Sequence, residues 1–125
     1  MKNFSRAERV GGQIQKVLSD ILLRDSKDPR LKSATVTGVK MTRDLKIARV
    51  YFAVSGGPTR RQEVLRGFES ACGYLKRALA AELSLRYMPE LTFFYDESFD
   101  YGDNIDRLLK QLKTENGSNH SALEA

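Results

Sequence analysis

The sequence feature that most constrains the fold is a long helical pattern whose apolar face is interrupted by a glycine. Apolar residues recur at the spacing of one helix face on both sides of Gly73; they are Val64, Leu65, Phe68, Cys72, Leu75, Ala78, Leu79 and Leu83. A glycine inside a helix is less favourable than alanine by about 1 kcal/mol. We therefore predict two helices that meet at a break over residues 71–73 (Ala-Cys-Gly). The first should begin with a capping box between Thr59 and Gln62.

A further helix is predicted near the start of the chain. The Ser-Arg-Ala-Glu run at residues 5–8 forms a capping box, and an apolar face continues from there to Leu22. Gly11 and Gly12 lie inside this helix, where they lower its helical propensity and indicate close approach by another backbone. The helix should end before Pro29, because the residue before a proline is disfavoured in the helical conformation.

Three strands are predicted from alternating apolar residues. Residues 34–41 form the first, and a one-residue slip of the pattern at Gly38 indicates a β-bulge. Residues 46–54 form the second strand of a hairpin, and residues 90–96 form the third strand. A short terminal helix is expected at about residues 104–113. The order α-β-β-α-α-β, followed by this helix, predicts an α+β domain with helices packed on one face of the sheet.

The charge is distributed unevenly along the 125 residues. Residues 1–87 contain 18 lysine and arginine residues against 8 aspartate and glutamate residues, whereas residues 88–125 contain 3 against 8. A basic segment of this kind suits a polyanionic partner, since neutralising phosphates releases counterions. The length fits one domain, and residues 114–125 have no apolar face and are expected to be disordered. The single cysteine, with no secretory signal and no long apolar segment, indicates a cytoplasmic protein.

The sequence contains little that supports catalysis. Its only histidine, His120, lies in the tail expected to be disordered, so neither a catalytic triad nor a histidine metal site is expected. The glycine-rich residues 56–59 lack the lysine and the length of a P-loop. Acidic residues near the C-terminus lack the spacing of a calcium-binding loop; they are Asp96, Glu97, Asp100, Asp103 and Asp106. We therefore expect no enzymatic activity, no metal site and no cofactor.

RNA binding is favoured by the basic helix that follows the predicted break. The sequence lacks the aromatic motif of an RRM and the GxxG loop of a KH domain, but its element order is KH-like, with residues 71–73 where that loop would lie. The backbone amides there, with Lys76 and Arg77, are suited to hold phosphates without reading bases. Two alternatives stay open: a module that binds an acidic protein, and a small hydrolase that uses the acidic segment with a metal ion.

Several motifs, in one order and at fitting spacing, resemble the ribosome-binding factor A family over about residues 4–110. They are Arg6-Ala-Glu-Arg9-Val10 with Ile14, Asp28-Pro29-Arg30-Leu31, Val36-Thr37-Gly38-Val39, the segment from Asp44 to Tyr51, Ala71-Cys72-Gly73, and the segment from Leu85 to Phe93 with Asp96. The resemblance implies a KH-like fold of the second type in which an Ala-x-Gly kink replaces GxxG. We expect this RNA-binding domain to occupy residues 1–113.

The resemblance also implies a function and a set of contact residues. It suggests a monomeric, non-catalytic assembly factor that binds the immature 30S ribosomal subunit. Such a factor assists late maturation of 16S rRNA, including processing of its 5′ end, supports growth in the cold, and is linked to a ribosome-associated GTPase for its release. The RNA-facing residues that match the family are Arg43, Lys46, Arg49, Ser70, Ala71, Gly73, Lys76 and Arg77. Arg60, Arg61 and Arg66 are added from their charge alone.

Overall fold

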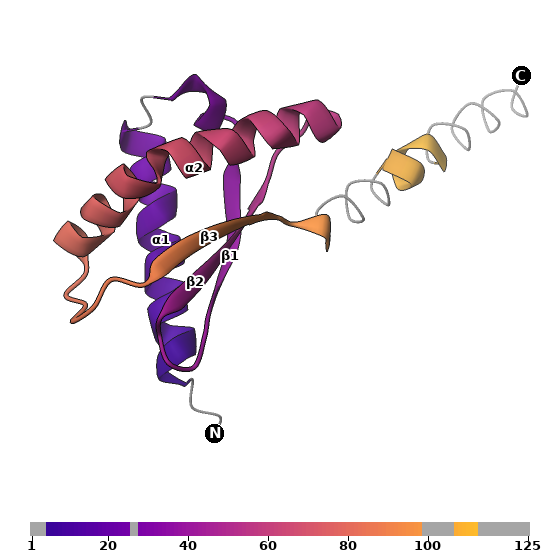
Figure 1. Cartoon of the computed structure of the whole chain (residues 1–125). Helices are drawn as coiled ribbons and strands as arrows, with labels where there is room; N and C mark the ends of the chain where they lie inside the picture. Colours follow the sequence, from indigo (N-terminus) through magenta and orange to yellow (C-terminus); the bar gives the residue numbers. More distant parts are fainter. Residues whose placement is uncertain (1–4, 26–27, 99–106, 113–125) are drawn as a thin grey trace, which may run out of the picture. The chain divides into compact units, whose positions relative to one another are not determined.

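The structure, a computed structural model, describes residues 5–25, 28–98 and 107–112. The chain divides into two units, one that ends at Tyr95 and one that begins at Asp96. The elements of the first unit, in chain order, are helix α1 (Arg6–Asp25), the short 3-10 helix η1 (Pro29–Leu31), strands β1 (Thr35–Met41) and β2 (Ile47–Ala53), helix α2 (Gly57–Glu82) and strand β3 (Glu90–Tyr95) (Figure 1). In the second unit residues 107–112 are helical, within the terminal helix predicted from the sequence.

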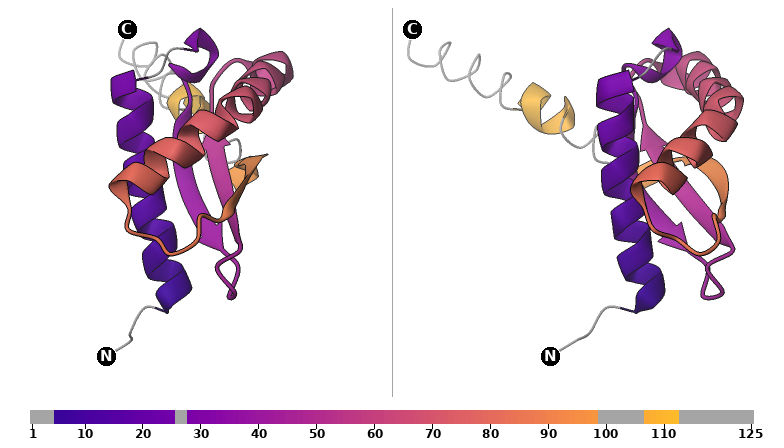
Figure 2. Two further views of the ribbon diagram at one scale, coloured as in Figure 1. Left: turned by 60° about the vertical axis from the view of Figure 1, so that its left-hand side comes forward. Right: turned by 90° about the vertical axis from the view of Figure 1, so that its left-hand side faces the viewer.

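The sheet has the strand order β1-β2-β3. Strands β1 and β2 form the predicted antiparallel hairpin, and its register shifts between Val36 and Gly38, which confirms the bulge. Strand β3 runs parallel to β2 at the opposite edge. Helices α1 and α2 lie on the same face of the sheet in Figures 1 and 2. The predicted α+β architecture is therefore confirmed.

The core lies between this sheet face and the two helices. Alternate residues of β2, namely Ala48, Val50 and Phe52, are buried as the sequence pattern predicted. They form one cluster with apolar residues of both helices, including Ile14, Leu18 and Ile21 of α1 and Val64, Phe68, Leu75 and Leu79 of α2. The Phe68 ring stacks on Phe93 of β3, with 4.9 Å between ring centroids. A sheet covered on one face only leaves the other face available to solvent or a partner.

The start of α1 and its glycine pair follow the sequence prediction in part. The hydroxyl of Ser5 accepts a hydrogen bond from the amide of Glu8 at 3.1 Å, which caps the helix. A Cβ atom on Gly11 would lie 2.8 Å from the carbonyl oxygen of Val39 in β1. The close backbone approach is therefore confirmed at Gly11. It does not occur at Gly12, where a Cβ would meet nothing within 4 Å.

Helix α2 differs from its prediction at its start. It begins at Gly57 rather than Thr59, and the N-cap residue is Gly56, at φ 123°, without a side-chain capping bond. The predicted Thr59–Gln62 capping box is therefore wrong. Pro58 explains the difference, because a proline in the first helical turn is compatible with a helix that starts before it.

The middle of α2 also departs from the sequence prediction. The helix is continuous from Gly57 to Glu82, so residues 71–73 do not separate two helices. Its axis nevertheless bends about half-way along, as both figures show. The kink is thus a bend within one helix. Helix α2 continues through Gly73 because Phe68, Leu75 and Leu79 are buried on either side of it. Each buried side chain stabilises the folded state by about 1.5–3 kcal/mol. The glycine costs about 1 kcal/mol of helix stability, which is less.

Candidate nucleic-acid interface

Four of the predicted RNA-facing residues lie in one row along α2. Arg66, Ser70, Gly73 and Arg77 are all exposed, and they are separated by four, three and four positions. Residues at this spacing share one side of a helix. We call this row the α2 stripe. A Cβ atom on Gly73 would lie 3.4 Å from Nη1 of Arg77, so the guanidinium group lies beside the bare backbone of the glycine. The stripe offers two cations and a hydroxyl to a polyanion.

Lys76 does not belong to this row. Consecutive helix residues lie about 100° apart, and the Lys76 side chain points instead to the start of β3. Its Nζ atom lies 2.9 Å from the carboxylate of Glu90, and the lysine side chain is 28% exposed. This ion pair competes with a phosphate for the Lys76 ammonium group.

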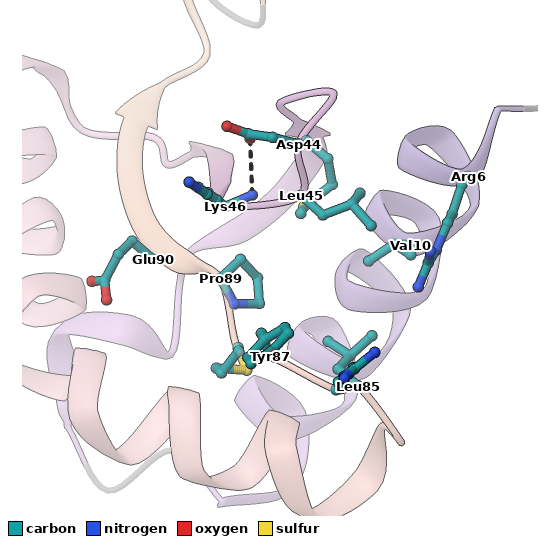
Figure 3. Close-up of a pocket in the computed structure, with 12 residues that line it drawn as sticks. Arg6, Val10, Asp44, Leu45, Lys46, Leu85, Tyr87, Pro89 and Glu90 are labelled. Carbon is teal, nitrogen blue, oxygen red and sulfur yellow. Dashed lines mark hydrogen bonds between the residues drawn. The ribbon is translucent and has the colours of Figure 1, made fainter.

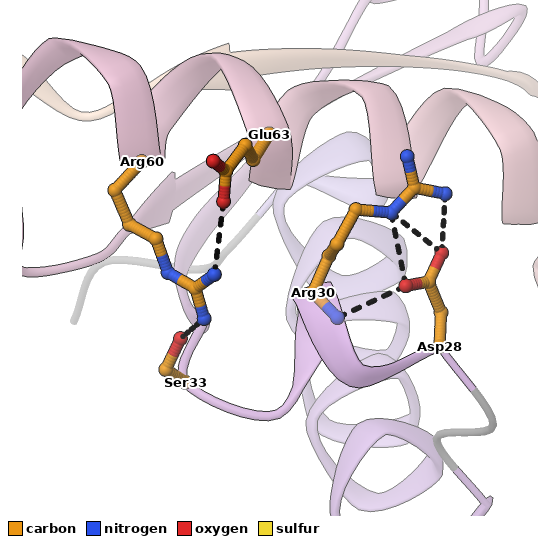
Figure 4. Close-up of polar contacts among 5 residues, drawn as sticks. All are labelled: Asp28, Arg30, Ser33, Arg60 and Glu63. Atoms are coloured by element: carbon orange, nitrogen blue, oxygen red, sulfur yellow. Dashed lines mark hydrogen bonds and ion pairs between the residues drawn. The ribbon is translucent and has the colours of Figure 1, made fainter.

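Arg60 and Arg61 are held by neighbouring groups. The guanidinium of Arg60 donates to the hydroxyl of Ser33 at 2.7 Å and to the carboxylate of Glu63 at 3.1 Å (Figure 4). The guanidinium of Arg61 lies over the ring of Tyr95, with 4.2 Å between its carbon and the ring centroid. Ala71, another predicted residue, is half-buried against the core. These three residues contribute to the packing of α2 in this structure.

The hairpin places the other three predicted cations at separate points. Arg43 is exposed in the turn, Lys46 is exposed where β2 is about to begin, and Arg49 is exposed on the sheet face that the helices leave uncovered. Asp44 orders the turn: its carboxylate accepts from the Thr42 hydroxyl at 2.6 Å and from the Lys46 amide at 3.1 Å. The Thr42 hydrogen bond, followed by that from Lys46, lowers the pKa of Asp44. The turn therefore presents its cations from an ordered backbone.

The Asp-Pro-Arg-Leu motif that helped to reveal the family resemblance has a packing role. The carboxylate of Asp28 accepts from the backbone amide of Arg30 at 2.9 Å and from its guanidinium at 2.6 Å (Figure 4). Hydrogen bonding to the Arg30 side chain lowers the pKa of Asp28. A Cβ on Gly67 of α2 would lie 3.1 Å from Leu31 and 3.3 Å from Arg30. The motif thus forms the surface against which α2 packs.

A groove that the sequence analysis missed lies between the start of α1, the hairpin turn and the segment before β3 (Figure 3). Its volume is about 720 Å³. Its apolar walls include Val10, Leu45 and Leu85, and the cations Arg6, Lys46 and Arg86 also line it. No sequence signal marks this groove, because its walls come from three segments that are distant along the chain.

No group of three or more potential metal ligands occurs in the part of the chain that the structure describes. Of the acidic residues named above, Asp100, Asp103 and Asp106 lie outside the described residues, as do His120 and residues 114–125. Cys72 is half-buried, and burial raises the pKa of its thiol.

Within the described ranges, no helix combines the length and apolarity that a membrane span requires.

The comparison with protein families agrees with the fold and with the resemblance. The family model for ribosome-binding factor A matches residues 6–109. This chain belongs to that family. It is 53% identical to the ribosome-binding factor A of Desulfatibacillum aliphaticivorans over 112 residues, which cover 90% of this chain and 91% of that protein. It is 43% identical to the Geobacter sulfurreducens protein over 115 residues, which cover 92% of this chain and 98% of that protein.

Solved structures of family members share the fold. The solution structure of a ribosome binding factor A from Thermotoga maritima superposes with a TM-score of 0.65 at 29% identity, covering 78% of this chain and 92% of that one. A homology model of the Thermus thermophilus factor, fitted into a cryo-EM map of its complex with the 30S subunit, gives a TM-score of 0.61 at 25% identity. That match covers 73% of this chain and 96% of the other. The KH-like fold implied by the resemblance is confirmed.

Proposed function

We propose that this protein binds the immature 30S ribosomal subunit through 16S rRNA. The observation that carries the proposal is the α2 stripe, an exposed row in which Arg66 and Arg77 flank Ser70 and Gly73. The description of the Thermus thermophilus relative in complex with the 30S subunit supports the same partner. An exposed row of cations beside bare backbone suits the sugar–phosphate chain, which is contacted without reading bases.

The proposed role is that of a non-catalytic assembly factor in the cytoplasm, acting as a monomer. A factor that binds one rRNA conformation more tightly than another shifts the population toward the first by its difference in affinity. We propose that this shift assists late maturation of 16S rRNA and processing of its 5′ end. Cold stabilises incorrect RNA pairings, so the contribution to growth should be largest at low temperature. Release from the mature subunit is assigned to a ribosome-associated GTPase.

The test of the α2 stripe is a charge-reversal pair with a matched control. The variant Arg66→Glu/Arg77→Glu should bind purified 30S subunits more weakly, and the slope of log affinity against log salt should fall by about one for each lost phosphate contact. The control is Arg9→Glu/Lys16→Glu, which makes the same change in net charge at exposed positions of α1. The control should lose less affinity and keep its salt slope. Equal losses in the two variants would show that net charge alone, rather than the stripe, governs binding.

The cellular role requires a separate measurement. In extracts separated by sedimentation, the protein should travel with free 30S subunits and not with assembled ribosomes. A strain that lacks the gene should accumulate 16S rRNA with an unprocessed 5′ end, more strongly in the cold, and the Arg66→Glu/Arg77→Glu variant should fail to restore processing. Comigration with assembled ribosomes, or normal 16S ends at low temperature, would contradict the proposed role.

A further inference from the structure

The sheet face opposite the helices carries an aromatic pair formed by the exposed Phe94 and the half-buried Tyr51. Tyr51 of β2 and Phe94 of β3 are direct neighbours in the parallel register. Their ring centroids are 5.7 Å apart, with the ring planes tilted by 30°. Phe94 is 44% exposed, in contrast to Phe52 and Phe68, which are buried in the core. An aromatic pair on the sheet face that α1 and α2 leave uncovered presents flat apolar surface to a binding partner.

Cations surround this pair. The Nζ atom of Lys40 in β1 lies 5.8 Å from the centroid of the Tyr51 ring. Arg49 precedes Tyr51 by two residues, so it projects from the same face, and its register partners are Lys40 on one side and Thr92 on the other. We call the surface formed by Lys40, Arg49, Tyr51, Thr92 and Phe94 the outer sheet face.

Carboxylates are nearly absent from these strands. In β1, β2 and β3, all of which the structure describes, the single acidic residue is Glu90. Glu90 is paired with Lys76 of α2. By strand alternation Glu90 lies on the same face as Thr92 and Phe94, at the start of β3, where Lys76 pairs with its carboxylate. The outer sheet face therefore combines aromatic rings with positive charge, and the one carboxylate of its strands is already paired.

We propose that the outer sheet face binds an unpaired stretch of RNA, with bases stacked on Tyr51 and Phe94 and phosphates near Lys40 and Arg49. Aromatic side chains stack on any base, and neighbouring cations follow the backbone. The bases of a duplex are already stacked on each other, so a paired helix cannot use these rings. A second copy of this chain fits less well, because two such faces would bring their own lysines and arginines together. This inference rests on the proposed 30S-binding function and adds a second surface to the α2 stripe.

The central test uses Phe94→Leu in the full-length chain. Leucine keeps an apolar side chain at this position but removes the aromatic ring. The probe is a labelled oligouridine of about ten nucleotides, followed by fluorescence anisotropy. Phe94→Leu should weaken binding about 5- to 150-fold while the circular dichroism spectrum stays unchanged. A duplex RNA of the same length should bind with equal affinity to the wild-type protein and the variant.

Two further variants separate stacking from charge. Phe94→Leu should leave the salt slope unchanged, whereas Lys40→Gln should reduce it by about one unit. The matched control is Tyr87→Ala, since Tyr87 is 76% exposed and has the Arg86 guanidinium 5.5 Å from its ring centroid, but lies outside the sheet. This control should bind oligouridine like the wild type.

A direct reporter avoids reliance on loss of binding. The chain contains no tryptophan, so Phe94→Trp introduces a unique fluorophore at the proposed stacking position. Oligouridine should quench its emission with a midpoint equal to the dissociation constant from anisotropy. Absence of quenching during saturable binding would overturn the proposal.

The outcomes distinguish this inference from the proposed function. If wild-type protein binds 30S subunits but Phe94→Leu has the same affinity for oligouridine as the wild type, only the proposed RNA binding by the outer sheet face is refuted. If wild-type protein fails to bind 30S subunits while Phe94→Leu still weakens oligouridine binding, the proposed function alone is refuted. Polyglutamate should not compete with oligouridine. If it does compete, and if Phe94→Leu weakens polyglutamate binding as much as oligouridine binding, the occupant of this face is an acidic protein and the proposal is overturned.

Discussion

The close contact between α1 and β1 at Gly11 leads to a quantitative prediction about stability. A methyl group added by Gly11→Ala would lie 2.8 Å from the Val39 carbonyl oxygen and 3.5 Å from the Met41 side chain. The first neighbour is backbone within a strand, so it cannot rotate away. Helix α1 must shift relative to the sheet, which disturbs the packing of Ile14, a residue that is 0% exposed.

Gly12→Ala provides the matched control within the same helix turn. Both substitutions gain about 1 kcal/mol of helix propensity, since both replace a glycine by alanine inside α1. Only Gly11→Ala adds the steric term, and overpacking of this kind costs about 1–3 kcal/mol. We therefore expect Gly12→Ala to raise the free energy of unfolding by about 1 kcal/mol. Gly11→Ala should be about 1–3 kcal/mol less stable than Gly12→Ala.

Urea denaturation followed by circular dichroism at the helix band measures this difference. The slope of the free energy against urea should be the same in both variants, because the surface exposed on unfolding is nearly unchanged. In thermal unfolding, each kcal/mol should separate the midpoints by about 4–8 °C. If Gly11→Ala proves as stable as Gly12→Ala, the backbone contact between α1 and β1 is not the constraint that the structure indicates.

Three other predictions concern charge and the end of the chain. Asp28→Asn should be less stable than the wild type near neutral pH. Because Arg30 lowers the folded-state pKa of Asp28, the difference in free energy of unfolding should shrink as pH falls below 3.8. Urea unfolding at a series of acidic pH values measures this difference. Equal pH dependence of the two proteins would contradict this. Glu90→Gln should release Lys76, tighten 30S binding and raise the salt slope by about one unit; an unchanged slope would exclude Lys76 as a phosphate ligand. Deletion of residues 114–125 should leave the urea midpoint unchanged, and a loss of cooperative unfolding would refute the predicted disorder.

Features with a local cause were predictable from the sequence. The alternation in β2 and the slip at Gly38 follow directly from the period of a strand, since a residue faces the core or solvent by its position alone. The close approach at Gly11 was predicted because a glycine in a helix needs a compensating reason. The same reasoning was wrong at Gly12, because two adjacent glycines in the sequence do not reveal which of them faces β1.

Two local predictions failed because other interactions outweighed them. Thr59 has the sequence of an N-cap, but Pro58 and Gly57 extend the helix before it. Gly73 weakens a helix, but buried side chains before and after it keep α2 continuous. At Gly73 local propensity contributes less than the packed apolar face, so burial decides there.

The sequence by itself determined the α+β class, the basic character and the family, because these depend on periodicity, charge and motif order. Only the tertiary structure paired Lys76 with Glu90, which lies 14 positions away in β3. Only the parallel register of β2 and β3 placed Tyr51 beside Phe94. Contacts of this kind depend on how distant segments pair, and strand pairing is set by the packed core rather than by the residues that meet on the opposite face.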